Sequence, residues 1–384
     1  MRFPEFSGEW NKYTINDLAT VVGGGTPDTT VKSYWGGDIQ WFTPSEIGKN
    51  KYVDFSKRTI TRDGLDNSSA KLLPLHTILL SSRATVGECS IASNECTTNQ
   101  GFQSLIAKQC NIDFLYYLIQ TKKKDLIRNA CGSTFLEISA NEIRKIKVAV
   151  PVQNEQEQIA KLLSLIDERI ATQNKIIEDL KKLKSAISKQ AFAQKPNGWN
   201  RLDTLFSKGK AGGTPTSTNK EYYNGEIPFL SISDITKQGK YVRYTENHLS
   251  RSGLENSSAW VVPEYSLIIS MYASVGLVTI NEVPITTSQA MFAMQLRDKD
   301  LLDYLYYYLS YFKYRHIHKY LETGTQSNIN ADIVRGIMIP TYGHSRNMKI
   351  ASTLQGIDAK IDNELSVLKL FNRQKNYLLS QMFI

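Results

Sequence analysis

Two glycine-rich loops could bind an anion through their backbone. Residues 23–27 read GGGTP and residues 211–215 read AGGTP. Glycine lets backbone amides approach a phosphate group closely. No lysine follows either loop at the spacing of a nucleotide-binding P-loop, and no G-x-G-x-x-G pattern follows a strand. These absences favour the alternative, a structural turn that leads into a strand, while a phosphate contact near Thr26 and Thr214 stays open.

Polar side chains that could read base edges follow the apolar run at residues 75–81. Ser82 and Arg83 come directly after it, and an arginine beside small hydroxyls suits bidentate contact with guanine or a phosphate clamp. Residues 98–100 (TNQ) offer hydroxyl and amide groups that suit adenine edges or phosphates. The alternatives are a surface ion pair for the arginine and ordinary turn chemistry for residues 98–100.

The same motifs occur a second time, displaced by roughly 190 residues. Residues 64–70 (GLDNSSA) match 253–259 (GLENSSA), and 97–100 (TTNQ) match 286–289 (TTSQ). A constant offset over this length indicates an internal duplication. The candidate nucleic-acid contacts are Thr26, Ser82, Arg83, Thr98, Asn99 and Gln100 in the first copy, and Thr214, Tyr272, Thr287, Ser288, Gln289 and Gln326 in the second.

Charge and composition narrow the classes of partner. The chain has 384 residues, 41% of them hydrophobic, and a formal net charge of +9. A basic balance favours a polyanionic partner, of which nucleic acid is the commonest inside cells. The sequence contains no run of about 18 apolar residues, which a membrane-spanning helix would need. The N-terminus lacks the apolar stretch of a signal peptide. We therefore expect a cytoplasmic protein that does not bind membranes.

Residue patterns typical of catalysis are missing from the sequence. There is no adenine-methyltransferase motif, P-loop or zinc signature, and the four cysteines form no Cys-x-x-Cys pair. The cysteines all lie in the first copy, which indicates reduced thiols rather than a disulfide framework. We expect no catalytic residue and no metal site in this chain. A nuclease with a short, unrecognised carboxylate site stays open as the alternative.

Each copy is predicted to be a mixed α/β domain followed by one long helix. Short β-rich segments separated by Gly, Pro and Asn predict strands, and residues 114–127 and 301–320 have helical patterns. The predicted division is a domain at 1–151, a helical region at 152–195, a second domain at 196–340 and a second helical region at 341–384.

Both helical regions carry apolar residues at alternating spacings of four and three, which is the pattern of a coiled coil. Polar residues interrupt the two seams at equivalent places, Gln173 with Glu364 and Lys184 with Lys375. A helix with one narrow apolar stripe is unstable alone, so we expect the two to pack on each other, antiparallel about a pseudo-two-fold axis. The seam residues are Ile159, Leu163, Ile166, Ile170, Ile177, Leu180 and Ile187, and Ile350, Leu354, Ile357, Ile361, Leu368, Phe371 and Leu378.

These motifs, in this order and repeated twice, resemble the specificity subunit of a type I restriction-modification system. The resemblance covers essentially the whole chain. It rests on the Gly-Gly-Thr-Pro loops, residues 34–39 (YWGGDI), residues 82–87 (SRATVG), residues 99–101 (NQG) and the approach to the first long helix from Pro151 to Ile159.

The resemblance implies two target-recognition domains, each of which reads one half of a bipartite, asymmetric double-stranded DNA site. It also implies that the helices set the gap between the halves; a helix of about 35 residues spans about 50 Å, or about 15 base pairs. Such a subunit does no chemistry itself. Its expected partners are modification subunits, two in number, which bind S-adenosylmethionine and methylate adenine, and restriction subunits, which use ATP and Mg²⁺.

The second copy departs from the family pattern where its long helix begins. Residues 341–346 (TYGHSR) stand where the first copy has residues 152–157 (VQNEQE). This difference leaves open whether both helix starts bind a partner equally well. Two rival functions also stay open: a stand-alone DNA-modifying or DNA-cleaving enzyme, and a coiled-coil interaction protein that never touches DNA.

Overall fold

The computed structural model describes residues 2–132, 136–272, 274–319 and 328–383. The chain divides into two compact units. Unit 1 comprises Met1–Lys175 and Ser366–Ile384, and unit 2 comprises Ile176–Leu365. Each unit therefore contains one globular domain and parts of both long helices.

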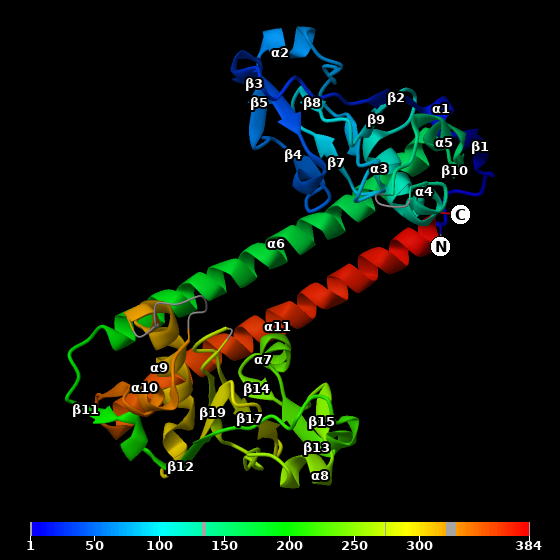
Figure 1. The fold of residues 1–384 in the computed structure, drawn as a ribbon. Helices are drawn as coiled ribbons and strands as arrows, with labels where there is room; N and C mark the ends of the chain where they lie inside the picture. The colour runs from blue at the N-terminus through cyan, green and yellow to red at the C-terminus, as the bar shows by residue number, and fades with distance from the viewer. Residues whose placement is uncertain (1, 133–135, 273, 320–327, 384) are drawn as a thin grey trace. The chain divides into compact units, whose positions relative to one another are not determined.

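The domain of unit 1 is built on two small sheets (Figure 1). Five strands form one sheet, in the order β2-β9-β6-β7-β4, and three form the other, in the order β5-β3-β8. A separate antiparallel pair, β1 with β10, closes the domain. The strands are β1 (Asn11–Thr14), β2 (Ala19–Gly23), β3 (Trp35–Phe42), β4 (Tyr52–Val53), β5 (Arg58–Ile60), β6 (Ile78–Leu80), β7 (Cys89–Ala92), β8 (Cys96–Thr98), β9 (Gln103–Ala107) and β10 (Lys147–Val150).

The domain of unit 2 repeats this topology strand for strand. Its sheets have the orders β12-β19-β16-β17-β14 and β15-β13-β18, with β11 and β20 as the separate pair. Even the register shift in the long strand recurs, between Trp35 and Ile39 in β3 and between Tyr223 and Ile227 in β13. The strands are β11 (Gly198–Arg201), β12 (Phe206–Ala211), β13 (Tyr223–Leu230), β14 (Tyr241–Val242), β15 (Asn247–Leu249), β16 (Leu267–Ser270), β17 (Val278–Asn281), β18 (Thr286–Thr287), β19 (Met291–Leu296) and β20 (Met338–Thr341). The predicted duplication and α+β class are confirmed.

Short helices cover the sheets in both domains. The predicted helix at 114–127 is in fact two helices, α3 and α4, because Lys122 leaves helical geometry between them (φ −90°, ψ 5°). In unit 1 the short helices are α1 (Ile15–Leu18), α2 (Arg62–Asp66), α3 (Ile112–Thr121), α4 (Lys123–Arg128) and α5 (Ala140–Lys145). In unit 2 they are α7 (Ile232–Gln238), α8 (Arg251–Glu255), α9 (Leu302–Arg315) and α10 (Ala331–Arg335).

The two long helices are α6 (Gln153–Phe192), with 40 residues, and α11 (His344–Met382), with 39 residues. Every predicted seam position on both helices is buried or half-buried, including the polar interruptions. The neighbouring positions on either side are mostly exposed. The pattern of four and three in the sequence therefore identified the buried stripe correctly.

Within each unit, one half of α6 packs with the opposite half of α11. In unit 1, Leu163 and Ile166 of α6 share a hydrophobic cluster with Leu378 and Met382 of α11 and with the domain core. In unit 2, Phe192 at the end of α6 shares a cluster with residues near the start of α11, Ala351 and Leu354. The start of one helix thus pairs with the end of the other, which is an antiparallel arrangement.

Replacement of a seam residue tests this packing. Leu163 is 0% exposed, so Leu163→Ala should lower the free energy of unfolding by about 2–5 kcal/mol, through lost burial and a residual cavity. Leu165, two residues further on, is 49% exposed, and Leu165→Ala should change stability by less than about 0.5 kcal/mol. Urea denaturation of both variants gives the comparison. Equal losses would contradict the assignment of the seam.

Candidate nucleic-acid interface

In unit 1, four sequence motifs that lie far apart in the chain meet in one place. A Cβ added at Gly24 would lie 2.0 Å from the carbonyl oxygen of Asn99, and one added at Gly25 would lie 2.3 Å from the backbone nitrogen of Ala70. The backbone N–H of Ser82 donates to the carbonyl oxygen of Gly101 (2.8 Å). The glycine loop, residues 98–101, the 67–70 turn and the loop after β6 therefore form one cluster.

Unit 2 has the same cluster. A Cβ at Gly212 would lie 2.0 Å from the carbonyl oxygen of Thr287, and one at Gly213 would lie 2.2 Å from Ser258 Oγ. The backbone N–H of Met271 donates to the carbonyl oxygen of Ala290 (2.7 Å). In both units the close approach of backbone to backbone leaves no room for a side chain. This packing accounts for the glycines without a bound phosphate.

The predicted contact residues divide by exposure. The hydroxyls of Ser82, Thr98 and Thr287 are buried, with no hydrogen-bond partner in the described structure. The exposed candidates are Arg83, Gln100, Thr214, Tyr272 and Gln289, and the half-buried ones are Thr26, Asn99 and Ser288. Gln326 lies outside the described residues. Only the exposed and half-buried side chains are placed to meet a ligand directly.

A threonine–glutamine pair is identical in the two units. Thr26 donates its hydroxyl hydrogen bond to the side-chain oxygen of Gln100, and Thr214 does the same to Gln289. Each pair joins the glycine loop to the turn after β8 in unit 1 or after β18 in unit 2. The hydrogen bond fixes the orientation of the glutamine amide, which has two N–H groups as donors.

The two units differ at the loop after β6 and β16. Arg83 lies 3.6 Å from Glu137 in an ion pair whose two side chains are 46% and 48% exposed. The predicted alternative of a surface ion pair is thus present, although a pair this exposed holds an arginine only weakly. Unit 2 has Tyr272 at the equivalent position, 39% exposed. Here the two domains present different chemistry to a ligand.

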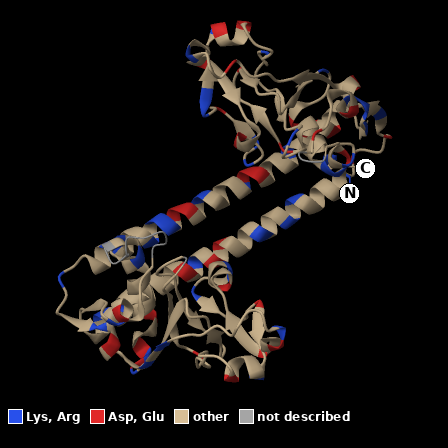
Figure 2. Ribbon diagram, viewed as in Figure 1, with Lys and Arg blue, Asp and Glu red and all other residues tan. Residues whose placement is uncertain are grey.

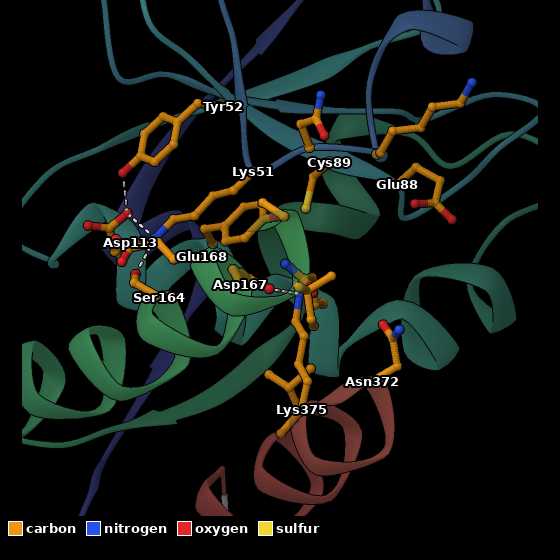
Figure 3. Close-up of a pocket in the computed structure, with 18 of the residues that line it drawn as sticks. Lys51, Tyr52, Glu88, Cys89, Asp113, Ser164, Asp167, Glu168, Asn372 and Lys375 are labelled. Atoms are coloured by element: carbon orange, nitrogen blue, oxygen red, sulfur yellow. Dashed lines mark hydrogen bonds and ion pairs between the residues drawn. The ribbon is translucent and has the colours of Figure 1, made fainter. Parts of the chain in front are cut away.

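Sequence reasoning missed a second group of polar residues, where the domain of unit 1 meets the helices (Figure 3). The ammonium group of Lys51 lies 2.7 Å from Asp113 and donates to Ser164 Oγ (2.6 Å). The hydroxyl of Tyr117 donates to Asp167 (2.7 Å), which also forms an ion pair with Lys375 of α11 (2.7 Å). We call Lys51, Tyr52, Asp113, Tyr117, Asp167 and Lys375 the first bridge. All of them except Tyr117 border a hollow of about 900 Å³.

Unit 2 contains the equivalent set. Lys240 lies 2.6 Å from Asp303, and the hydroxyl of Tyr307 donates to Asp358 (2.8 Å). Asp358 forms an ion pair with Lys184 of α6 (2.5 Å). We call Lys240, Tyr241, Asp303, Tyr307, Asp358 and Lys184 the second bridge. The clue in the sequence was the pair of seam interruptions, Lys184 and Lys375, which lacked an explanation until their partners were known.

The phenols of the bridges remain protonated at neutral pH. Burial and then Asp113 raise the pKa of Tyr52, and burial raises the pKa of Tyr241 to about 12. Burial, reinforced by the charge of Asp167, also raises the pKa of Tyr117. Each tyrosine therefore acts as a hydrogen-bond donor to a carboxylate.

Each long helix is fixed to its own domain at its start, by different residues. Glu155, 0% exposed, accepts two hydrogen bonds from Arg2 (2.7 and 2.6 Å). The seams align Ile159 with Ile350, which places Arg346 opposite Glu155. Arg346 donates to the side chain of Gln194, just after the end of α6. One position further, Gln156 and Asn347 each bind the backbone before the helix. The two helix starts thus have different hydrogen-bond partners, and side chains hold both of them.

Charges of both signs are interspersed over the elements of both units (Figure 2). Among the described residues, no group of three or more His, Cys, Asp and Glu side chains is arranged to hold a metal ion. None of the described helices is both long and apolar enough to cross a bilayer.

A family model described as the type I restriction modification DNA specificity domain matches residues 7–182 and again residues 196–369. The chain belongs to this family. The two matches correspond to the two copies found in the sequence, so each copy contains one specificity domain.

Individual relatives carry the same description. The chain is 33% identical over 257 residues to the type I restriction enzyme MjaIX specificity subunit of Methanocaldococcus jannaschii. The aligned region covers 60% of this chain and 59% of that subunit. The chain is 28% identical over 175 residues to the EcoR124I/EcoR124II specificity subunit of Escherichia coli, covering 44% and 43%. The matches thus span less than two thirds of these specificity subunits.

Solved structures of the family share the fold over the full length. The S subunit of a type I restriction-modification system from M. genitalium aligns with a TM-score of 0.59 at 16% identity, covering 100% of this chain and 99% of that one. A chain from a study of assembly and conformational transition of the type I R-M system aligns with a TM-score of 0.62, also at 16% identity, covering 98% of each. At this identity the likeness establishes the fold of the specificity-domain chain.

The glycine packing gives a prediction about the loop cluster. Gly24→Ala should lower the free energy of unfolding by about 1–3 kcal/mol, because the added methyl group meets the backbone of residues 98–99. Gly8→Ala is the control, since nothing lies within 4 Å of its Cβ position. Thermal denaturation of both variants provides the measurement, and an unaffected Gly24→Ala protein would contradict the described packing.

Proposed function

We propose that this chain is the non-catalytic DNA-recognition subunit of a type I restriction-modification complex. Each unit would read one half of a bipartite, asymmetric site in double-stranded DNA. The observation that carries the proposal is the family match to both copies, which fold into domains of identical topology. The net charge of +9 suits a DNA partner.

The partners would supply the chemistry. Two modification subunits would bring S-adenosylmethionine and methylate adenine, and restriction subunits would bring ATP and Mg²⁺. The relatives are specificity subunits of type I restriction enzymes, which supports assembly of this chain with partner subunits. The complex would act in the cytoplasm, where chromosomal DNA of a prokaryotic cell is found.

Residues that match between the units and residues that differ have different expected roles. Gln100 and Gln289 are held in the same way by a threonine, so they suit a contact that both half-sites share, such as a backbone phosphate. Arg83 and Tyr272 differ, so they suit the reading of unlike bases. An asymmetric site requires this combination.

The decisive experiment maps methylated adenines in the native host, with the gene intact and deleted. The proposal predicts a bipartite motif that loses its methylation on deletion and regains it on complementation. Purification of the tagged chain from the host should recover a methyltransferase subunit. Purified chain that methylates or cuts DNA unaided would instead establish the enzyme alternative. An unchanged methylome and no partner would overturn the proposal.

Substitution of Arg83 separates base reading from phosphate binding. Arg83→Ala should relax discrimination at one position of the half-site read by unit 1, by about 1–3 kcal/mol. Gln100→Ala, its neighbour in the same cluster, should weaken binding to all sequences equally. Binding of the assembled complex to a panel of duplexes measures both. Uniform weakening by Arg83→Ala would mark it as a phosphate contact.

The length of the helices should set the gap between the half-sites. At 40 residues, α6 extends for about 60 Å. A heptad inserted into α6 alone should disturb the paired seam and lower stability, whereas matched heptads in α6 and α11 should lengthen the gap in the methylated motif. A methylated motif with its original gap in the matched variant would rule out this role.

A further inference from the structure

We propose that the two bridges are positioning devices that fix the angle at which each domain is held on its helices. The effect of the bridges on DNA recognition rests on the proposed function, because the angle of a DNA-binding domain decides which base pairs it reaches. The bridges themselves are contacts within each unit.

The first bridge links four parts of unit 1. Lys51 comes just before the edge strand β4, Asp113 lies in the first turn of α3, Asp167 belongs to α6 and Lys375 to α11. Tyr117 connects Lys51 with Asp167, since its ring lies 4.8 Å from the Lys51 ammonium group and its hydroxyl donates to Asp167. One continuous set of polar contacts therefore runs from the edge of the sheet to both helices.

The attachment at the β4 edge is polar rather than hydrophobic. The main hydrophobic cluster of unit 1 joins α1, α3, α4, α5 and four strands of the large sheet (β2, β6, β7 and β9) to the helices, and none of its described members belongs to β4. A hydrophobic contact tolerates small rotations because it has no preferred direction. A second attachment with directed hydrogen bonds and ion pairs, placed at the far edge of the sheet, prevents such rotation.

The burial of the bridge lysines indicates that the bridges set the geometry of each unit more than they stabilise it. The side chain of Lys51 is 9% exposed and that of Lys240 is 10% exposed. Buried ion pairs contribute little net stability, because the loss of hydration offsets their attraction. Their recurrence in both units, each time with two aspartates and two lysines, is better explained by the single geometry that they enforce.

The two long helices have opposite roles in the two bridges: the helix that supplies the aspartate in one bridge supplies the lysine in the other. Asp167 of α6 pairs with Lys375 of α11 in unit 1, whereas Asp358 of α11 pairs with Lys184 of α6 in unit 2. Each domain is therefore tied both to the helix that follows it in sequence and to the other one. A domain held in this way cannot tilt without breaking a contact with one of the two helices.

Distance measurements within each unit test the proposal in the full chain. Spin labels at Phe55→Cys and Lys161→Cys report on unit 1, and labels at the equivalent exposed positions, Tyr244→Cys and Ser352→Cys, report on unit 2. Cys131→Ser removes the exposed cysteine; the other three cysteines are buried. Asp167→Asn and, separately, Lys51→Met should at least double the width of the 55–161 distance distribution and leave the 244–352 distribution unchanged.

Matched variants complete the test. Asp358→Asn should broaden only the 244–352 distribution, and Glu168→Gln, at an exposed acid that borders the same hollow, should broaden neither. If Asp167→Asn fails to fold by circular dichroism, Lys51→Met decides for unit 1. Folded variants with wild-type widths would overturn the proposal and leave the bridges as stabilising contacts only.

A second measurement separates this inference from the proposed function. Assembled complex is tested on duplexes whose gap is one base pair shorter or longer than that of the mapped motif. Asp167→Asn should reduce the preference for the correct gap at least threefold. Broadened distances in a chain whose complex binds no DNA would support the bridges and overturn the proposed function. Broadened distances with an unchanged preference in a DNA-binding complex would overturn the link between the angle and base reading.

Discussion

The structure depends on the paired seam of α6 and α11. A helix of about 40 residues with one narrow apolar stripe gains too little from its own hydrogen bonds to be stable in water. Each helix therefore requires a partner stripe of the same period, and the duplication supplies one within the same chain. Because the helices are antiparallel within each unit, the start of one lies beside the end of the other, where a domain is attached.

Much of this architecture could be predicted from sequence, because the relevant signals are local or repeated. The seam required only the alternation of four and three, and every predicted position from Ile159 to Leu378 is buried or half-buried. The duplication required only matching motifs. Helix boundaries were less accurate: nothing in the apolar pattern revealed the break at Lys122 that separates α3 from α4.

The exposure of the candidate contact residues could not be predicted from the sequence, because exposure depends on tertiary packing. Ser82, Thr98 and Thr287 were chosen for their hydroxyls, yet all three are enclosed by the backbone of the loop cluster. The bridges were missed for a related reason. Lys51, Asp113 and Asp167 are separated by more than 50 residues each and have no common motif, so only the fold brings them together. The matched lysines of the two seams were the one visible trace.

The division into units has a consequence for synthesis of the chain. Unit 2 is one continuous segment, Ile176–Leu365, whereas unit 1 needs its first 175 residues and the last 19, Ser366–Ile384. As the chain leaves the ribosome, every part of unit 2 is present before unit 1 is complete. The contacts of the first domain with Lys375 and Leu378 can form only after all of unit 2 has been synthesised. Closing so long a loop costs entropy, and until it closes Leu163 and Ile166 lack their apolar contacts with Leu378 and Met382.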